Sequence, residues 1–137
     1  MRTIRQLVEG LLRIRALRSS SRDEEALDAV GELLASTLQL QPSLVYAVSP
    51  ETLRSLLSPA GTPDLERMVV AGRLLKERAE LLSQLGRGEE AVWHAAQALV
   101  LLEEAQRVDV ERHLEAHYAG IEALQQLVDA SPPATER

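Results

Sequence analysis

The sequence predicts an all-α protein with about five main helices and one short connector helix. Apolar residues make up 45% of the 137 residues, and the abundant Leu, Ala, Glu and Arg are strong helix formers, whereas β-branched residues are sparse. Apolar residues also recur every three or four positions along most of the chain. The breaks between these periodic stretches contain Ser, Pro or Gly, which are typical of turns.

A chain of this length can bury about two thirds of its unfolded surface, so a single domain with a real core is expected. We place that domain at residues 1–130 and expect a disordered tail at 131–137, which begins with Ser-Pro-Pro. The core must be aliphatic, because the chain has no Phe, one Trp and two Tyr.

The net charge of −6 is distributed unevenly along the chain. Residues 1–22 carry six Arg and one Glu, or +5, which leaves −11 for the rest. This acidic bulk argues against a nucleic-acid-binding surface. The absence of Cys excludes disulfides and thiolate metal sites and is compatible with a cytoplasmic location. No apolar run reaches the roughly 18 residues that span a bilayer.

The first predicted helix covers residues 2–18 and has one broad apolar face. Arg15 and Arg18 lie on the side of the helix that carries this apolar face. Either the helix ends near them, or their guanidinium groups meet carboxylates from the acidic remainder of the chain. Ser21 and Glu24 form a capping-box pattern that predicts the start of a second helix.

The second helix should end before Pro42, and residues 41–62 should form a connector with little helical length. Within the connector, Ser49-Pro50 predicts a short helix that runs to about Leu57. Thr62-Pro63 then predicts the cap and first turn of a long helix.

The long helix should end at Leu85, because Gly86 is a natural left-handed terminator. The next helix begins at Glu89-Glu90. Asp109 predicts a break and the cap of a last helix that runs to about residue 130.

The two long helices form a hairpin that resembles a tetratricopeptide repeat (TPR), a motif of 34 residues. The residues that carry the resemblance are the packing positions Leu75, Ala79 and Leu82, the small residues Ala91, Ala95 and Ala98, the turn Gly86 and the opening Glu89-Glu90-Ala91. Small side chains at these positions let two helices cross closely. A weaker copy lies 65 residues earlier, where Glu24-Glu25-Ala26 aligns with Glu89-Glu90-Ala91.

The match departs from the family at Arg78, Ala79 and Glu103, where Leu, Gly and Pro are usual. Residues 1–106 also resemble an uncharacterised bacterial family of short TPR-like proteins, a domain of unknown function. That resemblance implies TPR-like antiparallel helix hairpins in a helical bundle or short solenoid, and no chemistry.

His113 and His117 are spaced as a metal-binding pair on one face of the predicted last helix. The chain has no HExxH or Glu-x-x-His pattern, and His117 also falls on the apolar stripe of that helix. A boundary histidine that forms one hydrogen bond explains the pattern as well. We predict no metal and no cofactor.

The Arg-rich first helix could use Arg2, Arg5 and Arg13 to bind an acidic partner or an anionic membrane surface. It lacks the Trp or Phe that interfacial helices normally carry, and its apolar face suits internal packing. Trp93 and Val100 form a second ridge on their helix, away from the alanine positions. That ridge either packs on the first, second or last helix or forms a partner or homodimer interface.

Four glycines, at positions 10, 31, 72 and 120, fall inside predicted helices. Each either permits a close helix crossing or is exposed and tolerated, and the sequence leaves both explanations open.

These observations predict a non-catalytic protein–protein interaction module, an adaptor or self-associating scaffold, with no small-molecule substrate. One alternative is a peripheral membrane-surface module that uses the first helix. Another is a small metal- or ligand-binding protein that uses His113 and His117.

Overall fold

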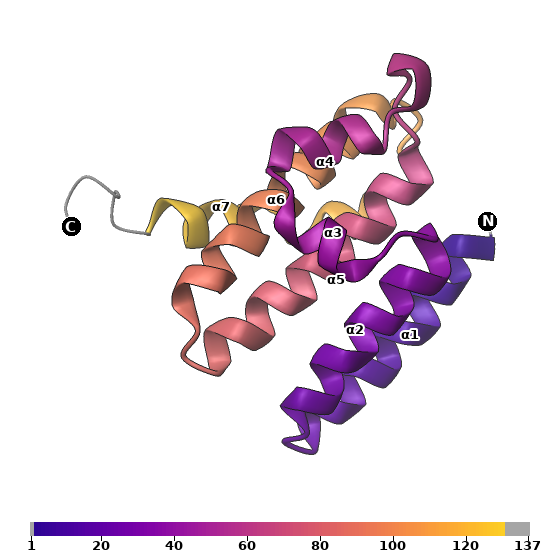
Figure 1. Ribbon diagram of the computed structural model, residues 1–137. Helices are drawn as coiled ribbons and strands as arrows, with labels where there is room; N and C mark the ends of the chain where they lie inside the picture. Colours follow the sequence, from indigo (N-terminus) through magenta and orange to yellow (C-terminus); the bar gives the residue numbers. More distant parts are fainter. Residues whose placement is uncertain (1, 131–137) are drawn as a thin grey trace.

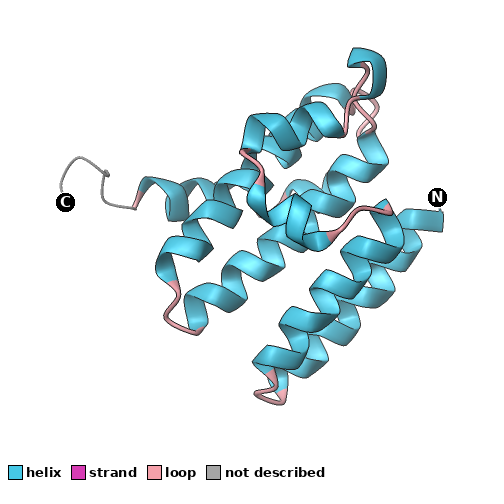
Figure 2. Cartoon of the chain, in the orientation of Figure 1, coloured by secondary structure: helices cyan, strands magenta, loops and turns pink. Residues whose placement is uncertain are grey.

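The computed structural model describes residues 2–130, apart from the side chain of Arg2. All regular structure in this range is helical, as the sequence predicts (Figures 1 and 2). The α-helices are α1 (Arg2–Ser19), α2 (Asp23–Leu38), α3 (Pro42–Ala47), α4 (Pro50–Leu56), α5 (Leu65–Gln84), α6 (Gly88–Val108) and α7 (Ile121–Asp129), with 3-10 turns η1 (Pro59–Gly61) and η2 (Glu115–Tyr118). The sequence did not predict α3, and the predicted tail at 131–137 lies outside the described residues.

Helices α1 and α2 form an antiparallel hairpin. The buried face of α1 is Ile4, Leu7, Leu11 and Ile14. The capping-box prediction at Ser21 is wrong. Ser21 adopts a left-handed conformation with φ 59°, and the residue before α2 makes no side-chain capping bond. The Ser21 amide instead donates to the Arg18 carbonyl of α1, so Ser21 terminates α1.

Helices α5 and α6 form the second hairpin and make the most extensive helix contact of the described chain. Gly86 is left-handed with φ 76°, as predicted. The cap of α5 differs from the prediction. The Asp64 carboxylate accepts the Arg67 amide at 3.2 Å, so Asp64, and not Thr62, is the N-cap. The helix therefore starts two residues later than expected.

Helix α5 packs against both helices of the first hairpin as well as against α6 (Figure 1). It runs parallel to α1, because Glu66 accepts the Ile4 amide at 3.2 Å and Glu77 meets Arg18 near the other end. It runs antiparallel to α2, since Arg67 donates to the Leu38 carbonyl at 2.7 Å.

Of the two alternatives for Arg15 and Arg18, ion pairing with carboxylates is confirmed. Arg18 Nη1 lies 2.7 Å from Glu77 Oε2, and Arg15 lies 3.6 Å from the other oxygen. The Glu77 carboxylate is almost fully buried, so these guanidinium groups compensate a charge that could not remain alone inside the protein.

The predicted last helix is wrong over residues 110–120. Asp109 does end α6, but its carboxylate accepts the amides of His113 and Leu114 and the Tyr118 hydroxyl, at 3.0, 2.9 and 2.8 Å. These bonds hold a compact turn that ends in η2. Gly120 therefore precedes α7 instead of lying inside a helix.

Candidate functional site

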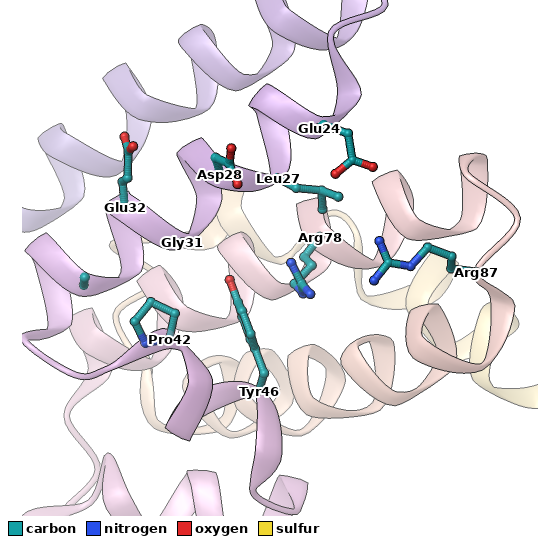
Figure 3. A pocket seen from close by; sticks show the side chains of 10 residues that line it. Glu24, Leu27, Asp28, Gly31, Glu32, Pro42, Tyr46, Arg78 and Arg87 are labelled. Atoms are coloured by element: carbon teal, nitrogen blue, oxygen red, sulfur yellow. The ribbon is translucent and has the colours of Figure 1, made fainter.

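A cavity of about 550 Å³, open to solvent, lies between α2 and the surface formed by α3 and α5. We call it the α2–α3 groove (Figure 3). Its lining residues are Glu24, Leu27, Asp28, Gly31, Glu32, Ala35, Pro42, Tyr46, Arg78 and Arg87. One wall is α2, and the other combines the connector helix α3 with α5 and the turn before α6.

Arg78 lies at the centre of the groove. Its guanidinium carbon is 4.0 Å from the centroid of the Tyr46 ring, a cation–π contact. Its Nε donates to His94 Nε2 at 3.2 Å. The guanidinium group of Arg78 therefore contacts an aromatic face and a neutral nitrogen acceptor.

His94 and Gln97 hold Arg78 and α3 in place. The Gln97 amide is buried and donates to the carbonyls of Val45 and Val48, both at 2.8 Å. Its oxygen therefore accepts from His94 Nδ1 at 2.8 Å, which leaves Nε2 as the acceptor for Arg78. Burial lowers the pKa of His94, and the Arg78 charge lowers it further, although the Gln97 bond opposes this.

Tyr46 carries the one buried side-chain polar atom without a hydrogen-bond partner among the described residues. Its hydroxyl points across the groove towards Gly31 (Figure 3). Burial raises the pKa of this phenol, and the nearby positive charge of Arg78 opposes that shift.

The α2 wall carries three carboxylates at one-turn spacing, those of Glu24, Asp28 and Glu32. Glu32 is 4.0 Å from Arg13, and both side chains are about 70% exposed, so this ion pair contributes little. Arg87, at the mouth of the groove, is paired with Glu90 at 2.8 Å. The α2 wall is therefore negative, and Arg78 and Arg87 line the same groove.

The predicted histidine pair is not arranged as a helical metal clamp. His113 Nε2 contacts Glu111 at 2.6 Å, while His117 Nδ1 accepts from Arg73 at 2.7 Å. Burial and the neighbouring Arg73 charge lower the pKa of His117. Residues 2–130 contain no group of three or more His, Asp or Glu side chains placed to hold a metal ion.

Trp93 is 40% exposed, and its indole donates to the Tyr46 carbonyl at 2.7 Å. The contact is with α3, which the sequence did not predict. Val100 is half-buried, and Arg5 and Arg13 are exposed on α1. The side chain of Arg2 lies outside the described residues.

The groove therefore combines residues that the sequence singled out with residues that it did not. Arg78 was visible as a departure from the TPR pattern. Sequence reasoning missed Tyr46, His94 and Gln97. The contacts of His94 and Gln97 with the α3 segment join residues about 50 positions apart, and the sequence did not predict α3, the helix that carries Tyr46.

The sequence matches no protein-family model, and it shows no significant similarity to a curated protein or a solved structure. The TPR resemblance therefore remains a prediction. Within residues 2–130, no helix combines the length and apolar character needed to cross a membrane.

Proposed function

We propose that this chain is a non-catalytic protein–protein interaction module that receives a segment of a partner in the α2–α3 groove. The observation that carries the proposal is the groove itself. It is open to solvent, has an apolar floor at Leu27, Pro42 and Tyr46, and has charged side chains along both walls. Peptide-binding grooves combine apolar contact with polar orientation in this way.

A non-catalytic role is supported by how the polar groups are used. Both nitrogens of His94 are engaged, one by Arg78 and one by Gln97. In Gln97, the amide nitrogen donates to the Val45 carbonyl and the amide oxygen accepts from His94. The imidazole is therefore committed to holding the groove and is not available as a general base for a bound substrate.

We also infer that the two hairpins are TPR-like. Two observations support this: α5 packs between the first hairpin and α6, and a Cβ atom at Gly72 of α5 would lie only 2.7 Å from the Leu102 side chain of α6. The insertion of α3, α4 and η1 between the hairpins is a departure from a simple tandem repeat. It creates one wall of the groove.

Affinity capture from the cells that express the protein tests this function. The wild-type chain is compared with Asp28→Arg, which reverses one exposed charge of the α2 wall. Glu103→Arg reverses an exposed charge on α6, outside the groove lining, and serves as the matched control. Partner proteins should be recovered with wild type and Glu103→Arg and lost with Asp28→Arg. Equal recovery by all three chains would contradict a role for the groove.

A further inference from the structure

His94 can accept the hydrogen bond from Arg78 only while its imidazole is neutral. The amide nitrogen of Gln97 donates to two carbonyls of the α3 segment, so its oxygen accepts from His94 Nδ1 at 2.8 Å. The other ring nitrogen, Nε2, faces the Nε–H of Arg78 at 3.2 Å and serves as its acceptor. An additional proton on the ring would sit on Nε2, where it would oppose this N–H and bring two positive charges into contact.

The groups around His94 keep its ring neutral at neutral pH. Burial lowers the pKa of His94 below its ordinary value, and the charges of Arg78 on α5 and Arg87 in the turn before α6 lower it further. The bond to Gln97 and the carboxylate of Glu90, one turn earlier on α6, act in the opposite sense. Both Glu90 oxygens already bind Arg87, at 3.1 and 2.8 Å, which limits their attraction for a protonated ring. His94 therefore gains its additional proton only in mild acid.

Arg78 lies where its displacement would change the groove. Its guanidinium group is held over the Tyr46 ring at 4.0 Å. The same uncharged ring packs edge-on against His94, with the two ring centroids 5.2 Å apart. Across the groove, α2 presents the carboxylates of Glu24 and Asp28 (Figure 3). A guanidinium group released from His94 is therefore drawn away from Tyr46 and towards α2, through the space that a partner segment would occupy.

We propose that Arg78 is a pH-controlled gate of the α2–α3 groove. With His94 neutral, Arg78 lies against Tyr46 and the groove is open. With His94 protonated, Arg78 crosses to the carboxylates of α2 and closes the groove. The α3 segment stays in place, because His94 Nδ1 donates to Gln97 in both states. The inference rests on the proposed function, since it assigns the regulation of the same groove, although the movement of Arg78 itself requires no partner.

Nuclear magnetic resonance of the full chain tests the gate from about pH 8 to 5, the range in which histidine changes charge. The side-chain protons of Arg78 should be shifted upfield at high pH, because they lie over the Tyr46 ring. This shift should disappear as pH falls, with the same midpoint as the His94 imidazole resonances, while the amides of residues 42–48 keep their protection against exchange. If His94 titrates while Arg78 stays over the ring, or stays neutral until the chain unfolds, the gate is overturned.

A substitution at His94 separates the gate from a general effect of acid. His94→Gln removes the proton site and keeps an uncharged oxygen acceptor, so the Arg78 resonances should stay upfield over the whole pH range. His117→Gln is the matched control, because His117 also accepts from an arginine, Arg73, at 2.7 Å. Its Arg78 transition should match that of the wild type. A transition that persists in His94→Gln, or is lost in His117→Gln, would contradict the assignment.

The destination of Arg78 is tested on the α2 wall. Glu24→Gln combined with Asp28→Asn removes the carboxylates that attract the released guanidinium group, so the midpoint of His94 protonation should move to lower pH. The shift should vanish when Arg78→Leu is also present, because the carboxylates act on His94 through Arg78. A shift of the same size with and without Arg78 would overturn the crossing to α2.

Affinity capture at two pH values distinguishes failure of the gate from failure of the proposed function. Recovery that depends on Asp28 at about pH 7.5 should be lost at about pH 5.5 in the wild type and retained in His94→Gln. Equal recovery by the wild type at both pH values would refute the gate and leave the proposed function standing. A chain that shows the Arg78 transition but no Asp28-dependent recovery at either pH would support the gate and refute the proposed function.

Discussion

Replacing Gly72 by alanine should destabilise the protein, whereas the same substitution at Gly31 should stabilise it. Both glycines lie inside α-helices, so the gain in helix propensity is about 1 kcal/mol in each case. The loss of unfolded-state entropy is also the same. The two substitutions therefore differ only in what the added methyl group meets.

At position 72 a Cβ atom would lie 2.7 and 2.8 Å from two carbons of Leu102 and 3.5 Å from the Ala98 carbonyl oxygen. Leu102 is fully buried, so the helices must separate. Overpacking of this kind costs about 2–3 kcal/mol, which leaves a net destabilisation of about 1–2 kcal/mol after the propensity gain. At position 31 the nearest atom is the Tyr46 hydroxyl oxygen at 3.5 Å, an ordinary contact, so the gain of about 1 kcal/mol should remain.

Urea denaturation followed by far-ultraviolet circular dichroism measures the difference directly. The free energies of unfolding of the two variants should differ by about 2–3 kcal/mol, with the wild type between them. Gly10→Ala should fall between the two variants, because its methyl group meets the flexible end of the half-buried Leu33. If Gly72→Ala were as stable as Gly31→Ala, the inferred close approach of α5 and α6 would be wrong.

Three further predictions follow from the buried polar groups. Arg18→Met should cost about 3 kcal/mol in urea denaturation, since it leaves the buried Glu77 carboxylate with only the more distant Arg15; addition of Glu77→Leu should recover most of that loss, and a double variant no more stable than Arg18→Met would refute the charge argument. Gln97→Leu should lower the free energy of unfolding by about 2–4 kcal/mol, because two carbonyls of the α3 segment lose their donor. Amide hydrogen exchange should also accelerate in residues 42–48, and unchanged exchange there would contradict the role of Gln97 in holding α3. The pKa values of His94 and His117 are lowered in the folded chain. The unfolded chain therefore binds these protons at higher pH, and the free energy of unfolding should decrease as pH falls below about 6.5. Replacement of both histidines by Gln should flatten this dependence between about pH 5.5 and 7.5, and an unchanged slope would contradict the assignment.

Much of the helical arrangement could be predicted because its causes are local. The spacing of apolar residues identified the buried residues of α1, although it also placed Val8 and Leu12 on the same face, and these two are exposed. Gly86 marked the turn between α5 and α6. Ser49 also caps α4 as expected, with its hydroxyl accepting the Thr52 amide at 3.1 Å. Each of these features depends on residues within a few positions of one another.

The caps that were predicted wrongly show the limit of local patterns. Ser21 has the residue type and spacing of a capping box, but the tight return of the chain onto α2 requires a left-handed residue at that point. Asp109 has the residue type of a helix cap, and its carboxylate does accept two amides. The buried Tyr118 hydroxyl adds a third bond, and the segment closes into a turn before a helix can propagate.

The candidate groove was even less accessible from the sequence. Arg78 was noted only because it replaces an expected leucine. Its role depends on Tyr46 from the connector and His94 from the next helix, which converge only when α3 docks on α6. Helix α3 is six residues long, so its position depends on Gln97 and Trp93 and not on its own propensity.

The sequence by itself determined that the chain is helical, where most helices begin and end, and which faces of the long helices are apolar. These properties follow from helix propensity, side-chain spacing and turn chemistry, which act over one or two turns. The tertiary structure alone decided that Gln97 and Trp93 of α6 hydrogen-bond to the α3 segment, that Glu77 is neutralised by Arg18, and that Arg78 and the acidic face of α2 line one groove. Those outcomes depend on which apolar faces pack together, and packing joins residues that no local pattern connects.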